Sequence, residues 1–314
     1  KESWLDLPNL VRKSEEGFQR NPPLFFDLKR LPSMTRSFVD NGRYFREGGQ
    51  AGVETKRGCP RDCIYCADPV AKGKNVRTRP PREVADELEH LVRQGIDAVH
   101  LCDSEFNIPL WHALAVCKEI SSRGLADRLR WYTYCSPVPF SRKLARKMAG
   151  AGCAGINFGV DSGDHTMLLA LGRSHTPGDI RAAVDFCREE GITVMLDLLI
   201  GAPGESRESI MRTVDLMKEV NPDRVGVAAG VRVYPGTSLS RMVESGSLHE
   251  GITGGENIHD PLFFMEPKIG DNVFAFLDHL IGDDERFFFF DPDSPKRNYN
   301  YNANQRLAEA IEKG

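Results

Sequence analysis

The sequence predicts an α/β fold in which parallel strands alternate with helices. Between residues 51 and 228, short apolar runs of strand length alternate with segments whose apolar residues recur at helical spacing. This unit repeats about six times, roughly every 30 to 40 residues, and such units pair their strands in parallel through right-handed crossovers. The composition, with 40% hydrophobic and 27% charged residues among 314, is typical of a folded globular chain. The strands are expected to curl into a barrel or a doubly wound sheet, and six units are too few for a complete eight-stranded barrel.

The individual elements follow from periodicity and from their end signals. Pro81 begins a helix that carries Val84, Leu88 and Leu91 on one face. Gly152 and Gly191 end two other helices, because glycine readily adopts the left-handed conformation found there. The predicted strands are residues 52–55, 96–102, 129–135, 155–160, 192–200 and 224–228. The predicted helices are residues 81–94, 110–122, 141–151, 177–190 and 206–220.

We expect two flanking regions around a central unit at residues 51–237. Residues 1–50 are interrupted by prolines and have irregular apolar positions, which predicts a linker lying over the next domain or the tail of a preceding domain. Residues 238–314 are expected to form a C-terminal α+β extension that covers the barrel. Within that extension we predict a strand at 261–264, a helix at 273–281 and a buried strand at 287–290, followed by a loop in which Tyr299 and Tyr301 are weak candidates for substrate contact.

Three closely spaced cysteines point to a metal centre. Three residues separate Cys59 from Cys63 and two separate Cys63 from Cys66. Thiolates at such spacing hold iron–sulfur clusters, and three of them fill three corners of a [4Fe–4S] cube and leave one iron free. A structural zinc site usually has four ligands in paired spacings, and an odd set of three does not fit a disulfide framework. The remaining cysteines are scattered through apolar segments and are expected to be small buried hydrophobes in a reducing cytoplasm; they are Cys102, Cys117, Cys135, Cys153 and Cys187.

The C-x3-C-x2-C spacing, with Tyr65 directly before the last cysteine, resembles the signature of the radical S-adenosylmethionine (radical SAM) superfamily. The resemblance implies a partial (β/α)6 TIM-like barrel, open on one side to admit a small-molecule substrate. It implies that the cluster reductively cleaves S-adenosylmethionine to a 5′-deoxyadenosyl radical that abstracts hydrogen from an organic substrate. It also implies a reductant such as flavodoxin or ferredoxin, and it places Tyr65 among the cofactor-binding residues.

Further candidates follow the strands, since sites in such barrels lie at the carboxyl ends of the strands. Asp103, Ser104 and Glu105 follow the second strand. The resemblance implies that acceptors there hold the amino group of the cofactor's methionine moiety, and the alternative is helix capping. After the fourth strand, Asp161 and Ser162 are candidates to hydrogen-bond the ribose hydroxyls or the methionine end.

Basic residues and a turn complete the candidate set. Arg173 lies where many members of the superfamily place a basic residue for the cofactor carboxylate, which an arginine can bind with two parallel hydrogen bonds. The resemblance implies that the turn at Gly201, after the fifth strand, lies near the adenine, and Glu205 is expected at the start of the next helix. Arg232 follows the sixth strand at the same rim.

Residues 1–50, which we call the lead-in, narrow the resemblance to one group within the superfamily. Residues 7–12, 21–23 and 27–32 resemble the linker of cobalamin (B12)-dependent radical SAM proteins, and residues 201–205 and 232–237 also look like that group. Many of its members are methyltransferases that act on unreactive carbons. No Asp-x-His-x-x-Gly element that would ligate cobalt is present in the chain.

Three functions remain open at this point. The first is C-methylation by a radical SAM enzyme with cobalamin, and the second is a cobalamin-independent radical SAM dehydratase, cyclase or rearrangement enzyme. The third is a non-catalytic Fe–S or zinc-binding protein. The net charge of −4 gives no strong attraction to nucleic acid or to anionic membranes, and the sequence has no apolar run of membrane-spanning length and no signal-peptide pattern. We therefore expect a cytoplasmic protein without nucleic-acid or membrane partners.

Overall fold

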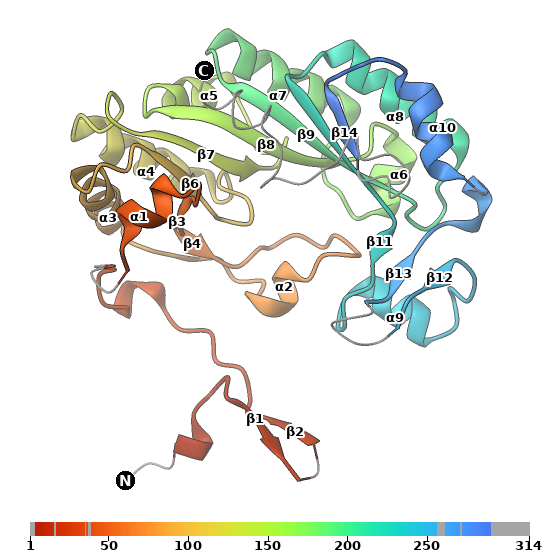
Figure 1. The fold of residues 1–314 in the computed structure, drawn as a ribbon, viewed down its shortest axis with the longest axis horizontal. Helices are drawn as coiled ribbons and strands as arrows, with labels where there is room; N and C mark the ends of the chain where they lie inside the picture. Colours follow the sequence, from red (N-terminus) through yellow and green to blue (C-terminus); the bar gives the residue numbers. More distant parts are fainter. Residues whose placement is uncertain are drawn as a thin grey trace.

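The computed structural model describes residues 4–15, 17–34, 36, 39–255, 261–270 and 272–289. Its centre is a seven-stranded sheet in the order β14-β10-β9-β8-β7-β6-β3 (Figure 1), and every neighbouring pair in it is parallel. β3 and β14 are the two edges and do not pair with each other, so the sheet is an open arc. The predicted α/β fold is therefore confirmed. The strands are β3 (Ala51–Val53), β6 (Ala98–Leu101), β7 (Arg130–Cys135), β8 (Cys153–Asp161), β9 (Thr193–Ile200), β10 (Arg224–Ala229) and β14 (Phe287–Phe289).

Helices cover one face of this sheet (Figure 1). The apolar core lies between that face and the helices, where alternate strand residues such as Trp131 and Leu196 are almost completely buried. Two of the helices begin at capping boxes, in which the side chains of Thr176 and Ser206 accept from backbone N–H groups of the first turn. The helices are α3 (Pro81–Arg93), α4 (Leu110–Ser122), α5 (Arg142–Ala149), α7 (Pro177–Glu189), α8 (Arg207–Val220) and α10 (Val273–Ile281).

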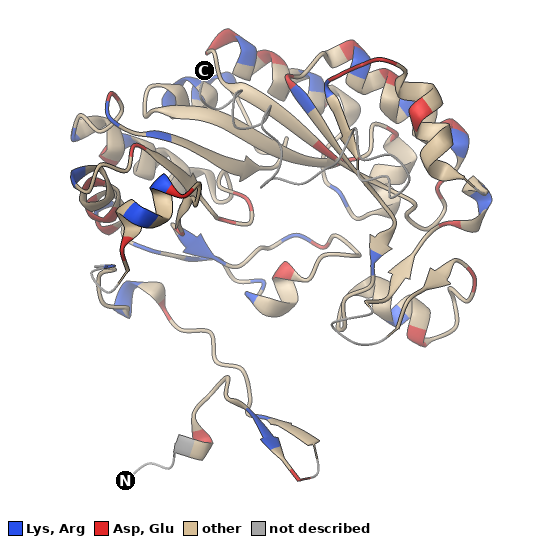
Figure 2. Cartoon of the chain, viewed as in Figure 1, with Lys and Arg blue, Asp and Glu red and all other residues tan. Residues whose placement is uncertain are grey.

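The other face of the sheet turns toward short irregular elements rather than toward these helices (Figure 1). Figure 2 shows charges of both signs mixed along the outer helices, while the strands are mostly uncharged. We call the side of the sheet that faces away from these six helices the inner face. The remaining elements of the central region are β4 (Lys56–Arg57), α2 (Asp68–Ala71), β5 (Arg77–Thr78), α6 (His165–Ala170) and β11 (Val231–Arg232). Those of the C-terminal region are α9 (Ser238–Glu244), β12 (Ile252–Thr253), β13 (Phe263–Phe264) and a 3-10 turn at Pro267–Ile269.

The lead-in is more ordered than a simple linker. β1 (Val11–Ser14) and β2 (Gly17–Arg20) form an antiparallel hairpin that lies apart from the main sheet (Figure 1). Its apolar side chains are exposed, so the sequence shows no alternation of buried and polar positions by which a strand pair could be predicted. The other lead-in elements are short helices at Trp4–Asp6, Leu28–Arg30 and α1 (Asn41–Arg46).

The C-terminal region contributes to the main sheet. The sequence placed residues 287–290 in an extension beyond the barrel, whereas β14 pairs in parallel with β10 and completes the sheet. The predicted burial of this run is confirmed for Phe287 and Phe289, each 1% exposed. Tyr299 and Tyr301 lie outside the described residues. None of the helices in the described ranges is long and apolar enough to span a bilayer.

Candidate cluster and cofactor site

The three clustered cysteines lie in the loop between β4 and α2, beyond the carboxyl end of β3. Backbone hydrogen bonds hold this loop on both sides: Cys59 N–H donates to the carbonyl of Gly73 at 3.0 Å, and Ile64 N–H donates to the carbonyl of Leu171 at 3.1 Å. All three thiols are free of disulfide bonds. The loop is therefore fixed by the rest of the fold and presents three reduced thiols.

Gly172 shows how closely the loop is packed. Its φ is +74°, and a Cβ at this position would lie 2.6 Å from the carbonyl oxygen of Asp62. No side chain fits between two backbones at that distance, and the left-handed conformation disfavours other residues as well. The cysteine loop thus depends on glycine in a segment more than 100 residues away along the chain.

A cavity of about 40 Å³ joins the cysteines to residues from two other parts of the sheet. Ser104 and Glu105 reach it from the loop after β6, and Arg173 from the loop after α6. These six residues were all predicted from the sequence, and the structure brings them together. The cavity is lined by Cys59, Arg61, Cys63, Cys66, Asp68, Pro69, Ser104, Glu105 and Arg173.

Arg173 connects the cysteines to the end of β8. Its Nη1 donates to Sγ of Cys63 at 3.1 Å, and its Nε lies 3.3 Å from Oδ2 of Asp161. The same carboxylate oxygen accepts from the Tyr65 hydroxyl at 2.5 Å. Asp161 has a φ of +63°, a conformation that is uncommon outside glycine and is frequent at functional positions. Four sequence-predicted residues therefore form one connected polar set beside the cavity.

Glu105 presents an unused acceptor to the cavity. Its side chain is 12% exposed, Oε1 lies 4.0 Å from Nη2 of Arg173, and Oε2 is buried without a hydrogen-bond partner among the described residues. Burial raises the pKa of the Glu105 carboxyl to about 7, while the nearby Arg173 charge opposes that shift. A buried carboxylate oxygen without a partner is suited to receive a cationic group.

The three clustered cysteines are protonated in the absence of a metal centre. Burial raises the pKa of the Cys66 thiol to about 12, and it also raises the pKa values of Cys59 and Cys63. These thiols keep their protons until a metal centre replaces them, so loading a cluster releases protons. Within the described ranges no three His, Cys, Asp or Glu side chains are arranged to hold a single metal ion. The donor set that fits a [4Fe–4S] cluster is three free thiols beside an unpartnered carboxylate oxygen and a guanidinium.

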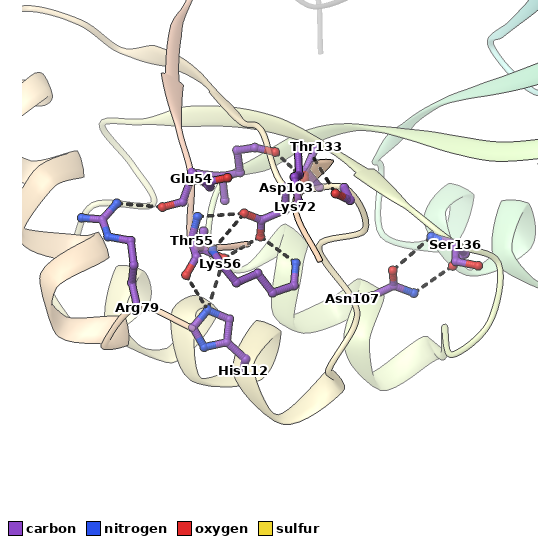
Figure 3. A network of polar contacts seen from close by, with 12 residues as sticks. Glu54, Thr55, Lys56, Lys72, Arg79, Asp103, Asn107, His112, Thr133 and Ser136 are labelled. Carbon is purple, nitrogen blue, oxygen red and sulfur yellow. Dashed lines mark hydrogen bonds and ion pairs between the residues drawn. The ribbon is translucent and has the colours of Figure 1, made fainter. Parts of the chain in front are cut away.

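Asp103 is placed differently from its neighbour Glu105. Its carboxylate accepts from Thr55 N–H at 2.8 Å, from Thr55 Oγ1 at 2.5 Å, from Lys56 N–H at 3.1 Å and from Lys56 Nζ at 2.8 Å (Figure 3). His112 Nε2 lies 3.2 Å from Thr55 Oγ1 and closes the network. These contacts occupy the carboxylate and tie the strand that leads into the cysteine loop to the end of β6. Asp103 thereby holds in place the backbone next to the site, and it does not line the cavity.

A second tie fixes the next loop. Asn107 Nδ2 donates to the carbonyl of Ser136 at 2.8 Å, and Ser136 N–H donates back to Asn107 Oδ1 at 3.0 Å (Figure 3). This pair joins the loops that follow β6 and β7. Both residues are buried, so the loop that carries Ser104 and Glu105 has anchors on two sides.

The other predicted residues have contacts elsewhere. Ser162 is fully buried and pairs with Thr213 Oγ1 at 3.0 Å, and Gly201 N–H donates to Glu205 Oε2 at 2.5 Å. Arg232 lies over the ring of Tyr234, with 4.8 Å from its guanidinium carbon to the ring centroid. None of these three predicted residues lines the cavity of the cysteines.

Three cavity residues, Arg61, Asp68 and Pro69, were not predicted as site residues. Arg61 lines the cavity and donates to Ser174 Oγ at 2.5 Å, and Asp68 accepts a short hydrogen bond from Ser104. Lys72 also donates to Ser104, at 3.3 Å. The only sequence signal for Arg61 and Asp68 is that they lie within or just after the cysteine motif.

Comparison with known proteins identifies what this chain is similar to. The model of the "Radical SAM superfamily" matches residues 53–217, which is more than half of the chain. A tryptophan 2-C-methyltransferase from Streptomyces laurentii is 38% identical over 215 residues, which cover 65% of this chain and 36% of that protein. An uncharacterized methyltransferase from Pyrococcus horikoshii is 28% identical over 230 residues, covering 72% of this chain and 50% of that protein. The chain thus spans between about a third and a half of these two relatives.

Solved structures of radical S-adenosylmethionine enzymes are also similar to this chain. The radical S-adenosylmethionine methyltransferase TsrM from Kitasatospora setae, with tryptophan substrate and an S-adenosylmethionine analogue bound, has a TM-score of 0.85 at 28% identity. The match covers 99% of this chain and 70% of that one. The cobalamin-dependent S-adenosylmethionine radical enzyme OxsB has a TM-score of 0.68 at 16% identity over 84% of this chain and 45% of that one, which shows a shared fold.

Proposed function

This chain belongs to the radical SAM superfamily, and from that membership we propose that it carries the catalytic barrel of a cobalamin-dependent methyltransferase acting on carbon. Family membership implies a [4Fe–4S] cluster and S-adenosylmethionine as cofactors. The observation that carries the methyltransferase assignment is the match to TsrM across 99% of this chain with a TM-score of 0.85. The similarity includes the lead-in, which the superfamily match at residues 53–217 leaves out.

In this proposal some residues of the site hold the cluster and others orient S-adenosylmethionine. Cys59, Cys63 and Cys66 would hold the cluster as thiolates, and Arg173, which donates to Sγ of Cys63, would lie beside one of these ligands. When bound, the cluster would supply an electron for cleaving S-adenosylmethionine, or S-adenosylmethionine would donate its methyl group. Cobalamin would supply a carrier for that methyl group. The unpartnered oxygen of Glu105 would accept from the amino group of S-adenosylmethionine.

Arg173 has a second role in this proposal. It is mostly buried, with a side chain that is 6% exposed, and it stays charged beside Asp161. A buried guanidinium binds a carboxylate far better than an exposed one because little water competes for it. We assign it the carboxylate of S-adenosylmethionine, with Asp161 and Tyr65 fixing its orientation.

The test begins with cluster loading under anaerobic conditions. The chain is reconstituted with iron and sulfide, then incubated with S-adenosylmethionine, dithionite, L-tryptophan as the probe substrate, and hydroxocobalamin either added or left out. The products measured are 5′-deoxyadenosine, S-adenosylhomocysteine and methylated probe. The variant with Cys59, Cys63 and Cys66 changed to Ala is the control, and Cys117→Ala, a buried cysteine outside the site, is the matched substitution.

The products separate the functions that the sequence left open. Methylated probe and S-adenosylhomocysteine that require cobalamin and vanish in the triple variant support the proposal. Formation of 5′-deoxyadenosine without any methyl transfer, with or without cobalamin, favours a cobalamin-independent radical enzyme. A fully loaded cluster that yields none of the three products favours a non-catalytic iron–sulfur protein.

A further inference from the structure

A second cavity, of about 700 Å³, lies between the lead-in and the segment that follows α2. Its walls come from three residues of the lead-in, from residues 73–78, and from Pro109 and Trp111 at the start of α4. It shares no lining residue with the cavity of the cysteines. A volume of this size is typical of a site for a small molecule. We call it the lead-in cavity.

Arg77 fixes the lead-in wall of this cavity. Its Nη1 donates to the carbonyl of Phe26 at 3.0 Å, and its guanidinium carbon lies 5.1 Å from the centroid of the Phe25 ring. In the same stretch, Asp27 Oδ1 accepts from Lys29 N–H at 3.1 Å and caps the short helix that follows. These contacts hold the lead-in against β5, so the cavity has a defined wall on this side.

A second wall of the lead-in cavity is joined to the cysteine loop. The carbonyl of Gly73 accepts from Cys59 N–H at 3.0 Å, and β4 and β5 pair in antiparallel fashion. A Cβ on Gly58 would overlap the carbonyl oxygen of Asn75, so the two backbones are in direct contact there. Backbone contacts therefore fix this wall as well, and the cavity is part of the folded structure.

The lead-in cavity carries a net positive charge. Its lining includes three basic side chains, Lys29, Lys74 and Arg77. Among the described residues that line it, only Asp27 is acidic. The ion pair of Lys74 with Asp62 has side chains that are 66% and 73% exposed, so water screens it and it contributes little. Lys29 is exposed and forms no ion pair within the described ranges. Two ammonium groups are thus available to a bound anion.

Trp111 supplies a planar surface in the same cavity. It is 61% exposed, although tryptophan side chains are on average highly buried. Its ring meets that of His112 in a T-shaped contact, with the centroids 5.5 Å apart at 76°. Most of the indole is therefore open to a ligand. Stacking of a nucleic-acid base on an aromatic side chain strengthens binding about fivefold to a hundredfold.

Charge and ring together select the ligand. Inorganic phosphate would use the two ammonium groups but not the indole, and a neutral aromatic molecule would use the indole but not the charge. A molecule that joins a planar ring to one or more phosphates is complementary to both parts of the lining.

We propose that the lead-in cavity binds a small phosphorylated molecule with a planar ring, of the mononucleotide kind. Lys29 and Lys74 hold its phosphates, and its ring stacks on Trp111. This inference does not rest on the proposed function, because no residue that we assign to the cluster or to S-adenosylmethionine lines the lead-in cavity.

The test is equilibrium binding, measured by isothermal titration with the cluster-loaded chain under anaerobic conditions. The probes are ADP, adenosine, which lacks the phosphates, and inorganic pyrophosphate, which lacks the ring. A short oligoadenylate distinguishes a free nucleotide from a nucleic-acid strand. The variants are Lys29→Gln, Lys74→Gln and Trp111→Leu, all at exposed positions. The matched controls are Lys118→Gln and Phe18→Leu, which are exposed and lie outside the cavity.

We expect ADP to bind about tenfold more tightly than adenosine or pyrophosphate. Lys29→Gln and Lys74→Gln each weaken the binding of ADP about two- to fivefold and leave that of adenosine unchanged. Trp111→Leu weakens the binding of ADP about five- to tenfold, because it removes the stacked ring. Both control variants bind ADP as wild type does.

Three results would overturn the inference. The first is ADP that does not bind, or that binds wild type and the three variants alike. The second is displacement of ADP by S-adenosylmethionine, which would place ADP in the cofactor site. The third is an oligoadenylate that binds far more tightly than ADP, which would assign the cavity to a nucleic-acid strand. Circular dichroism of each variant checks that a lost affinity is not a lost fold.

Discussion

Lys56 and Asp103 form an ion pair of 2.8 Å whose side chains are 2% and 0% exposed. The pair joins the residue three positions before Cys59 to the end of β6, and Thr55 adds two hydrogen bonds to the same carboxylate. Two loops that both contribute to the cysteine cavity are thereby held in register. Removing one partner from such a pair leaves an uncompensated buried charge, which costs far more than the pair itself contributes.

Changing Lys56 to Met is therefore expected to lower the free energy of unfolding by about 3–5 kcal/mol. Asp103→Asn is expected to be costly for the same reason, and the double variant to cost less than the sum of the two because each change already removes the shared attraction. Urea unfolding measures all three. Arg43→Met, which breaks the exposed pair with Glu47, should change stability by less than about 1 kcal/mol. Equal effects of Lys56→Met and Arg43→Met would contradict the positioning role.

Gly172→Ala is expected to reduce cluster loading. Its Cβ would lie 2.6 Å from the Asp62 carbonyl, so the cysteine loop must move. Iron and acid-labile sulfide per chain, measured after anaerobic reconstitution, should fall well below wild type. Gly191→Ala is the matched control, because its φ of +70° is similar but nothing lies within 4 Å of the added Cβ. That control carries only the conformational strain of about 1 kcal/mol, and unchanged loading in Gly172→Ala would show that the loop tolerates displacement.

Glu205 is expected to make stability pH-dependent. It is fully buried, and burial raises its pKa from 4.5 to about 7. Between these values the folded chain keeps the proton that the unfolded chain has lost, so this group's contribution to stability falls as the pH rises from about 4.5 to about 7. Glu205→Gln removes that dependence, and the variant should gain about 1–3 kcal/mol relative to wild type between pH 5 and pH 8.

Urea unfolding at several pH values measures this difference, and taking the difference cancels the other titrating groups. Glu244→Gln, an exposed carboxylate in α9, should leave the pH dependence unchanged. A constant offset between wild type and Glu205→Gln across the range would be inconsistent with a raised pKa at Glu205.

Arg173→Lys is expected to weaken binding of S-adenosylmethionine to the cluster-loaded chain about ten- to hundredfold. Lysine keeps the charge but cannot contact Cys63, Asp161 and a cofactor carboxylate at the same time. Arg212→Lys is the matched control, since Arg212 pairs with Asp164 outside the cavity. Affinity is measured by equilibrium dialysis, with iron content determined in parallel. Unchanged affinity at full iron content would remove Arg173 from the cofactor site.

The part of the site formed by residues close together in the sequence could be predicted. The part that depends on how the strands and loops pack against each other could not. The spacing of the three cysteines indicates a cluster without any structure. Asp103 and Glu105 are indistinguishable in sequence, yet one is consumed by Thr55 and Lys56 and the other faces the cavity, because the chain turns between them. That difference depends on the packing of β3 against β6, which no local pattern encodes.

The fold was predictable from periodicity except in the lead-in hairpin and at β14. The βα units have long apolar runs and clear end signals, so their helices begin and end within about two residues of the expected positions. β14 is only three residues long and follows a region of irregular pattern, so its place beside β10 could not be inferred. Short edge strands take their partners from tertiary packing alone.

The anchors of the cysteine loop also set an order of events during synthesis. The carbonyl of Ile64 accepts from the backbone N–H of Leu239, and its own N–H donates to Leu171. A ribosome that adds about 5–20 residues per second makes residue 239 roughly 9–35 seconds after residue 64. Throughout that interval the loop has its thiols but lacks the anchor from Leu239. Insertion of iron and sulfide into a preformed site is thus a late step, which can follow only after most of the chain has emerged.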